Sequence, residues 1–233
     1  MSVCDFTYRH YVETMKRAVD EGYRILTLKA YVEETPEDRR LILLRHDIDL
    51  SVQKAGKMAR IEHDLGIKST YFVRLHALYN IYNRKNYRTL MEMVDYGHEI
   101  GLHFEPELFA TEGENLEEVI MSEKEILEEL LGIKIYGFSI HSSGRIKEIY
   151  GIDYEKLFTE KLKKSFKYYA YSPTITRGFK YISDSNRYWR DGCICTHIGK
   201  IDRIYALIHP FWWAEKRLPV VTLIEEAMRG EVL

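Results

Sequence analysis

Cysteine is scarce in this sequence, and the few that occur do not form a disulfide pattern. Three are present among 233 residues, namely Cys4, Cys193 and Cys195. An odd number, with two of them one residue apart, is not typical of a disulfide framework, so a reducing compartment is the simpler interpretation. Cys193 and Cys195 could serve as soft metal ligands, but the sequence groups no further ligands beside them. We therefore expect the cysteines to be structural.

Long apolar runs and an excess of charge of one sign are also missing. The sequence has no run of about 18 apolar residues, the length that a transmembrane helix needs. Residues 1–22 lack the basic and apolar regions of a signal peptide. The formal net charge is only −2, so the sequence lacks the excess of basic residues that is typical of nucleic-acid-binding domains. We expect a cytoplasmic protein with no nucleic-acid or membrane partner, whose oligomeric state the sequence leaves open.

Two common catalytic motifs are absent as well. The sequence contains no glycine-rich loop of the GxxxxGK type, which argues against a phosphate-binding loop. It contains no GxSxG motif, which argues against a serine hydrolase.

What the sequence does contain is an alternation of short apolar runs with helical patterns. The apolar runs cover residues 41–49, 68–75, 98–104 and 134–141, and the helical patterns between them cover 52–65, 86–96 and 116–131. Glycine follows each helical pattern, and this alternation predicts βαβ units around a mostly parallel sheet. Further strands are expected within 166–175, 179–185 and 204–213, with helices over 6–21 and 219–231. We expect one domain over residues 1–233, either a (β/α) barrel or an open doubly wound sheet.

Polar side chains gather where the predicted strands end. They are Asp47, Asp49, Arg74, His76, His103, Glu105, Glu107, His141, Asp184 and His209. Parallel sheets and barrels place their functional sites at the carboxyl ends of the strands. We therefore expect these side chains to converge in space.

The two aspartates in the segment LRHDID are the most informative of these residues. Strand alternation places Asp47 and Asp49 on one face and His46 on the other. Two carboxylates on one face repel each other unless a cation lies between them. With histidine nitrogens nearby, the donor set suits Zn, Fe, Co or Ni better than Mg or Ca. The alternative is that one aspartate caps the helix near Ser51 or pairs with Arg45.

An ordered set of segments resembles the polysaccharide deacetylase superfamily, of the carbohydrate esterase family 4 type. The segments are LRHDID, STYFV, GHEIGLHFE, SIH and LIHPFWW, within residues 41–213. The resemblance implies a distorted (β/α)7-type barrel and a divalent metal, with Zn as the first expectation. It also implies a hydrolase that removes an acetyl or related N-acyl group from an amino sugar or glycan precursor.

The resemblance also assigns roles to individual positions. It implies Asp47 as general base, Asp49 and His103 as metal ligands, and His209 as general acid. Glu107 stands where the family has a second histidine ligand, and SIHSSG replaces its third motif. Glu107, Glu105 or His141 are the candidates for the third ligand. These departures leave a catalytically inactive, carbohydrate-binding protein as the alternative.

Further residues complete the predicted site. Asp184 is expected to orient His209. The candidate substrate-binding residues are Arg74, Trp189, Trp212 and Trp213, although at least one tryptophan of the last pair is expected to fill the end of the barrel. The expected partner is a small-molecule or glycan substrate.

Overall fold

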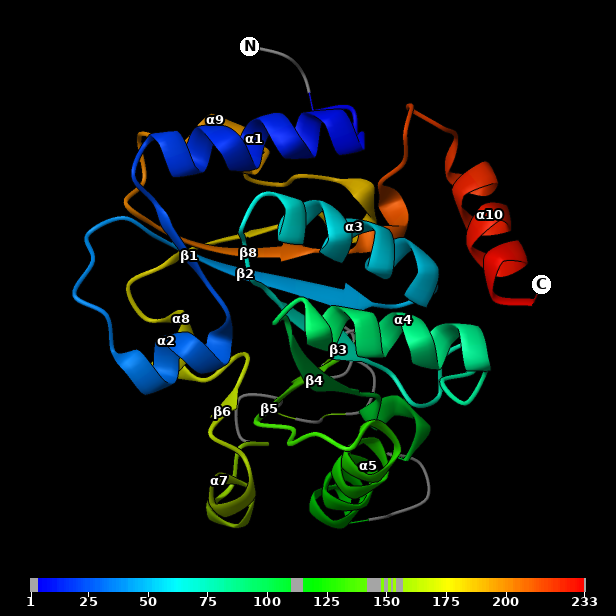
Figure 1. Ribbon diagram of the computed structural model, residues 1–233. Coiled ribbons are helices and arrows are strands. Elements are labelled where there is room, and N and C mark those ends of the chain that lie inside the picture. The colour runs from blue at the N-terminus through cyan, green and yellow to red at the C-terminus, as the bar shows by residue number, and fades with distance from the viewer. Residues whose placement is uncertain are drawn as a thin grey trace.

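A curled, parallel β-sheet forms the centre of the protein (Figure 1). The computed structural model describes residues 4–109, 115–141, 148, 151, 153 and 157–232. The strands are β1 (Arg24–Leu26), β2 (Leu41–Ile48), β3 (Thr70–Val73), β4 (Glu99–Phe104), β5 (Gly137–Ile140), β6 (Tyr168–Tyr169), β7 (Lys180–Ser183) and β8 (Arg203–Ile208). Seven of them follow the order β6-β5-β4-β3-β2-β8-β7, and β1 pairs with β2 beside this path. This curled arrangement is the distorted (β/α)7-type barrel that the resemblance to the polysaccharide deacetylases implied.

Every strand pairing in this sheet is parallel, so the carboxyl ends of the strands share one edge. β2 has strands on both of its sides. On one side, β8 pairs with it from Leu41 to His46. On its other side, β1 pairs with the first part of β2 and β3 with the last part. This register leaves the carboxyl end of β2 between β3 and β8.

Most of the helices cover the outside of the sheet (Figure 1), whereas α2 (Leu28–Glu34) and α8 (Pro173–Thr176) pack against its interior side chains. The other helices are α1 (Tyr8–Asp20), α3 (Val52–Asp64), α4 (Arg84–Asp95), α5 (Leu116–Leu131), α7 (Glu160–Ser165), α9 (Ile194–His197) and α10 (Val220–Val232). Short 3-10 turns follow three strands: η1 (Pro106–Leu108), η3 (Ser185–Arg187) and η4 (Pro210–Trp212). None of the helices among the described residues is long and apolar enough to cross a membrane.

The burial of β2 explains its nearly continuous apolar sequence. All eight of its residues are buried. Leu41 and Leu43 pack inside the curled sheet with Tyr205, whereas Ile42 and Leu44 pack with the helices outside. A strand buried on both faces needs apolar side chains on both faces. The alternation then carries Arg45 and Asp47 toward the interior.

Most strands are shorter than the segments predicted for them, and in two of these segments proline begins a helical turn. The segment 166–175 contains only β6, because Pro173 begins α8. The segment 204–213 ends its strand at Ile208, because Pro210 begins η4. Proline lacks the N–H group that continues a ladder, but it fits the first turn of a helix.

Gly137 in β5 allows a close approach between β5 and β6. A Cβ atom at this position would lie 2.0 Å from Cζ of Tyr168, far inside contact distance. We expect Gly137→Ala to lower the free energy of unfolding by about 1–3 kcal/mol, because the buried ring has to move. Urea unfolding measures this change. An unchanged midpoint and slope would contradict the packing described here.

Candidate active site

Five of the polar strand-end residues that were expected to converge line one cavity at the carboxyl edge of the sheet. The cavity has a volume of about 460 Å³ and is lined by Asp47, Asp49, His103, His141 and His209, together with Tyr171, Tyr181, Arg190 and Trp212. The site residues come from the ends of β2, β4, β5 and β8, so strand order in space brings together residues far apart in the chain. The expected convergence is present for these five.

Asp47 is held by Arg45 from the same strand. Nε and Nη2 of Arg45 donate to Oδ1 and Oδ2 of Asp47 at 2.8 and 2.7 Å. Arg45 is itself fully buried, and it also donates to the hydroxyl groups of Tyr171 and Tyr205. Burial alone raises the pKa of Asp47, but Arg45 and His103 outweigh it, and the pKa lies below its usual value. Asp47 is therefore an ionised carboxylate that faces both a guanidinium and the cavity.

Asp49 follows β2 and does not cap the next helix. The cap of α3 is Ser51, whose Oγ accepts from the backbone N–H of Lys54 at 3.2 Å. Oδ1 of Asp49 is buried and has no hydrogen-bond partner among the described residues. Nε2 of His103 lies 3.5 Å from this oxygen, and Nε2 of His209 lies 3.7 Å from Oδ2. Burial raises the pKa of Asp49, but these two imidazoles lower it to well below its usual value.

Ser139 orients the ring of His103. β4 and β5 pair with His103 opposite Ser139, and Oγ of Ser139 lies 2.6 Å from Nδ1 of the ring. Nε2 of the same ring lies 3.4 Å from Oδ2 of Asp47 and 3.5 Å from Oδ1 of Asp49. Ser139 was not predicted as a site residue. Its only signal was the segment SIH, and the strand register that places it against His103 cannot be read from that segment.

Asp49 and His103 fit a divalent metal site. Two ligand atoms about 2.1 Å from a tetrahedral zinc ion lie roughly 3.4 Å apart, and the separation between Oδ1 of Asp49 and Nε2 of His103 is 3.5 Å. The buried oxygen without a hydrogen bond is the kind of group that a cation would satisfy. Carboxylate oxygen and imidazole nitrogen are both ordinary zinc ligands.

The other two predicted ligands form a separate, neighbouring group. Nδ1 of His141 lies 2.6 Å from Oε1 of Glu107, and Glu105 completes a cluster whose ligand atoms lie within 4.8 Å of one another. Buried oxygens of Glu105 and Glu107 have no hydrogen-bond partner within the part of the chain that the structure describes. The rings of His103 and His141 are 5.6 Å apart, which brings the two groups side by side.

Asp184 holds His209 in place, together with Trp213. Oδ1 of Asp184 accepts from the backbone N–H of His209 at 2.9 Å and lies 2.7 Å from its Nδ1. Nε1 of Trp213 donates to Oδ2 of Asp184 at 3.0 Å. Burial lowers the pKa of His209, but the hydrogen bond to Asp184 and the charges of Asp49 and Asp47 raise it to about 9. Nε2 of this imidazole remains directed toward Asp49.

The four predicted substrate-binding residues are placed differently. Trp212 lines the cavity, whereas Trp213 is 1% exposed and belongs to the core. Trp189 packs against Phe6 in a stacked arrangement. Arg74 forms an ion pair with Glu105 and donates to the backbone carbonyl of Asp49 at 3.1 Å. These contacts favour a positioning role for Trp213 and Arg74, while Trp212 remains a candidate for substrate contact.

The contact between Asp184 and His209 leads to a testable expectation. We expect Asp184→Asn to lower the pKa of His209, because the imidazole loses its charge partner and the hydrogen bond to its Nδ1. Titration of the His209 ring by NMR measures this pKa. Asp202→Asn, which changes an ion pair with Arg39 on the surface, is the matched control, and an unchanged pKa of His209 in Asp184→Asn would contradict the assignment.

Comparisons with known proteins identify the fold. No protein-family model matches the sequence, and no curated protein matches it. Among solved structures, a polysaccharide deacetylase from Bacillus cereus is 13% identical and has a TM-score of 0.51, over 94% of this chain and 61% of its own. A family 4 carbohydrate esterase from Bacillus anthracis is 15% identical with a TM-score of 0.46, over 98% and 92%.

A pseudoenzyme of the same esterase family, also from Bacillus anthracis, is 14% identical with a TM-score of 0.45, over 83% of this chain and 62% of its own. This chain thus spans less than two thirds of the pseudoenzyme and of the Bacillus cereus deacetylase. At 13% identity the likeness to that deacetylase concerns the fold. The chain therefore has the fold of the polysaccharide deacetylases, in a divergent form.

Proposed function

We propose that the protein is a metal-dependent hydrolase that removes an acetyl or other N-acyl group from an amino sugar or glycan precursor. The observation that carries this proposal is the buried oxygen of Asp49 beside Nε2 of His103, in a polar cavity that Asp47 and His209 also line. The fold shared with the Bacillus cereus deacetylase is consistent with it.

Asp49 and His103 are the residues that would hold the metal. Zinc suits these donors best, and Fe, Co or Ni are the alternatives. The third protein ligand would come from the neighbouring group of Glu105, Glu107 and His141. A divalent metal in this position would polarise the substrate carbonyl and lower the pKa of a water toward neutrality.

Asp47 is the group that would accept a proton from the attacking water. It lines the cavity beside His103 and stays ionised, because Arg45 holds its pKa below the usual value. A carboxylate with a low pKa is a weak base, so it can act only on a water whose own pKa is lowered. Arg45 also fixes the orientation of the carboxylate through two hydrogen bonds.

His209 would donate a proton to the leaving amine, which is a poor leaving group without one. Its raised pKa keeps the imidazole charged at neutral pH. Asp184 holds Nδ1, so Nε2 is the nitrogen that is available to the cavity. Trp212, Tyr171 and Tyr181 line the same cavity and offer aromatic surfaces to a sugar ring.

Acetate release from N-acetylated amino sugars and short oligosaccharides tests this function. We expect zinc-loaded protein to release acetate and a chelator to stop the release. Asp47→Asn should lower the rate by roughly 100- to 10,000-fold, because the base is lost, while the protein keeps its metal. An Asp47→Asn variant as fast as the wild type would contradict the role of this residue.

A binding protein without activity is the second candidate, and one observation favours it. Both oxygens of Asp47 are occupied by Arg45, and Glu107 bonds to His141. Such a protein would still use the aromatic cavity to bind sugars. Sugars that raise the melting temperature of the metal-loaded wild type, with no acetate released from any of them, would support this candidate over the hydrolase.

A further inference from the structure

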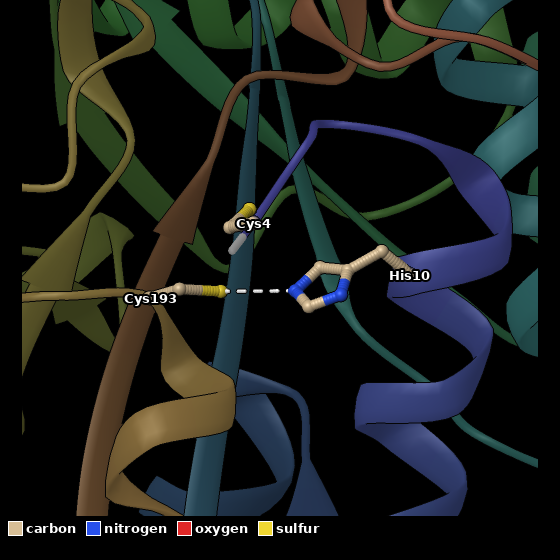
Figure 2. Close-up of side chains that lie close together, drawn as sticks. All are labelled: Cys4, His10 and Cys193. Atoms are coloured by element: carbon tan, nitrogen blue, oxygen red, sulfur yellow. Dashed lines mark hydrogen bonds between the residues drawn. The ribbon is translucent and has the colours of Figure 1, made fainter. Parts of the chain in front are cut away.

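Residues from two distant parts of the chain form a second cluster of metal-binding side chains. Cys4 precedes α1, His10 lies in its first turns, and Cys193 directly precedes α9 (Figure 2). Each offers one ligand atom, and these atoms all lie within 4.8 Å of one another. The cluster contains two thiols and an imidazole, whereas the cavity at the sheet edge is lined by carboxylates and imidazoles. It is therefore a separate site with a softer set of donors.

The geometry of this cluster suits a tetrahedral metal. Figure 2 shows the thiol of Cys193 directed at the ring of His10, with a separation of 3.5 Å between Sγ and Nε2. Two thiolates about 2.3 Å from a tetrahedral zinc ion lie roughly 3.8 Å apart, and a thiolate and an imidazole lie slightly closer. His10 and Cys193 are both buried, each 5% exposed. A buried group of this kind is built by the fold and is not a chance meeting of surface side chains.

The three ligand atoms that lie within 4.8 Å of one another are those of Cys4, His10 and Cys193. Cys195 lies beside Cys193 and His10 and is the candidate for a fourth ligand. It is half-buried and lies in α9, two residues after Cys193. Three cysteines and one histidine make up a common ligand set of structural zinc sites. The odd number of cysteines, which did not fit a disulfide framework, is accounted for by this set.

The surroundings of the cluster would stabilise thiolates. Nε1 of Trp189 donates to Sγ of Cys4 at 3.2 Å, and a hydrogen bond to sulfur favours its charged form. Arg17 of α1 donates to the backbone carbonyls of Cys195 and Ile198, each at 3.1 Å, which ties α1 to α9. Its guanidinium also brings a positive charge close to a site whose thiolates would carry excess negative charge.

We propose that Cys4, His10 and Cys193 bind a structural Zn²⁺ ion, with Cys195 as the candidate for the fourth ligand. The ion would join the N-terminal segment and α1 to the segment that precedes α9. That segment also carries Arg190 and Trp189, and Arg190 lines the cavity at the sheet edge. The zinc would thus fix one wall of the candidate active site without taking part in its chemistry.

Cobalt binding provides the test, because thiolate ligands give cobalt an intense ligand-to-metal charge-transfer band that carboxylates and imidazoles do not give. Reduced wild-type protein, purified without a metal-affinity column, should show this band and saturate it at about one equivalent per chain. The band should persist in Asp49→Ala, disappear in Cys193→Ala and weaken in Cys195→Ser. His63→Ala is a control that should leave the band unchanged, since His63 stacks on Tyr96, far along the chain from the cluster. Cobalt binding without the band, or a band that survives in Cys193→Ala, would overturn the proposal.

A measurement on the wild type covers the case in which a cysteine variant fails to fold. Zinc should slow the alkylation of Cys4, Cys193 and Cys195 by N-ethylmaleimide roughly 10-fold or more, because bound thiolates do not react freely. Mass spectrometry of the labelled protein shows which thiols are protected. Equal labelling with and without zinc would overturn the proposal, as would a disulfide between Cys4 and Cys193 in freshly purified protein that contains no zinc.

Discussion

Replacing Asp49 by alanine is expected to remove the metal of the candidate active site and to lower hydrolysis by roughly a thousand-fold. The reason is the position of this carboxylate: its buried Oδ1 lies 3.5 Å from Nε2 of His103 and receives no hydrogen bond from the described residues. Without it, only His103 and the third protein ligand remain, and two protein ligands hold a divalent cation weakly. Elemental analysis and acetate release measure the two effects on the same preparation.

Because the thiol cluster is also proposed to bind zinc, the same experiment distinguishes the two sites by their metal content. If both sites hold zinc, the wild type contains about two equivalents, and Asp49→Ala keeps about one at the cysteines. Asp202→Ala, which removes a carboxylate from an exposed ion pair, should leave both equivalents and the activity unchanged. A variant Asp49→Ala that keeps the full metal content and hydrolyses normally would show that the metal is bound elsewhere. Loss of the cysteine-bound equivalent alone, in Cys193→Ala, would leave the proposed hydrolase intact.

The largest expected effect on stability comes from Glu62 in α3. This carboxylate is completely buried behind β2, on the side of His46. It accepts from Tyr71 at 2.8 Å and from Ser69 at 2.5 Å, it also accepts from Tyr11, and it lies 2.7 Å from Nε2 of His46. The network satisfies several polar groups that would otherwise be buried without partners. His46 therefore has a structural role on the face opposite the aspartates.

We expect Glu62→Gln to lower the free energy of unfolding by about 3–5 kcal/mol, because it removes the buried charge and replaces one acceptor oxygen by an NH2 donor that faces other donors. Chemical denaturation followed by circular dichroism measures the change. Glu92→Gln is the matched control, since Glu92 forms an exposed ion pair with Arg60, and exposed pairs contribute only about 0–1 kcal/mol. A Glu62→Gln variant as stable as this control would refute the description of the network.

The same residue gives stability a defined dependence on pH. Burial raises the pKa of Glu62, but His46, His98 and Ser69 outweigh it and lower the pKa to about 2. A carboxylate whose pKa is lower in the folded state stabilises the fold fully above its unfolded pKa, and this contribution is lost as the pH falls toward the folded value. The wild type should therefore lose stability steeply between about pH 4.5 and pH 2. Glu62→Gln should not show the loss of stability that comes from protonating Glu62 in this pH range.

Local sequence patterns predicted the parallel sheet and the convergence of several strand-end residues at one cavity, for a physical reason. Parallel strands carry their carboxyl ends to one edge, so residues that end strands meet wherever the strands pair. Arg45, Asp47 and Asp49 follow the alternation of β2 and therefore lie on the same face. Asp47 can thus pair with Arg45 and also line the cavity. Where proline interrupted the pattern, at Pro173 and Pro210, the predicted strands were too long.

The contacts that depend on register and on tertiary packing could not be predicted in this way. Ser139 reaches His103 only because β4 and β5 pair in one particular register. The partners of Cys193 lie at the other end of the sequence, and α1 brings them close only when it packs beside α9. Trp213 is adjacent to Trp212 in the sequence, yet the turn η4 directs one into the core and the other to the cavity.

An anomalous difference map from crystals soaked in zinc tests most directly whether Asp49 and His103 hold the catalytic metal. We expect a peak about 2.1 Å from Oδ1 of Asp49 and from Nε2 of His103, with the third ligand drawn from Glu105, Glu107 and His141. A second peak is expected among the cysteines and His10. If zinc occupies only the cysteine cluster, or binds Glu107 and His141 without Asp49, the proposed active site is wrong.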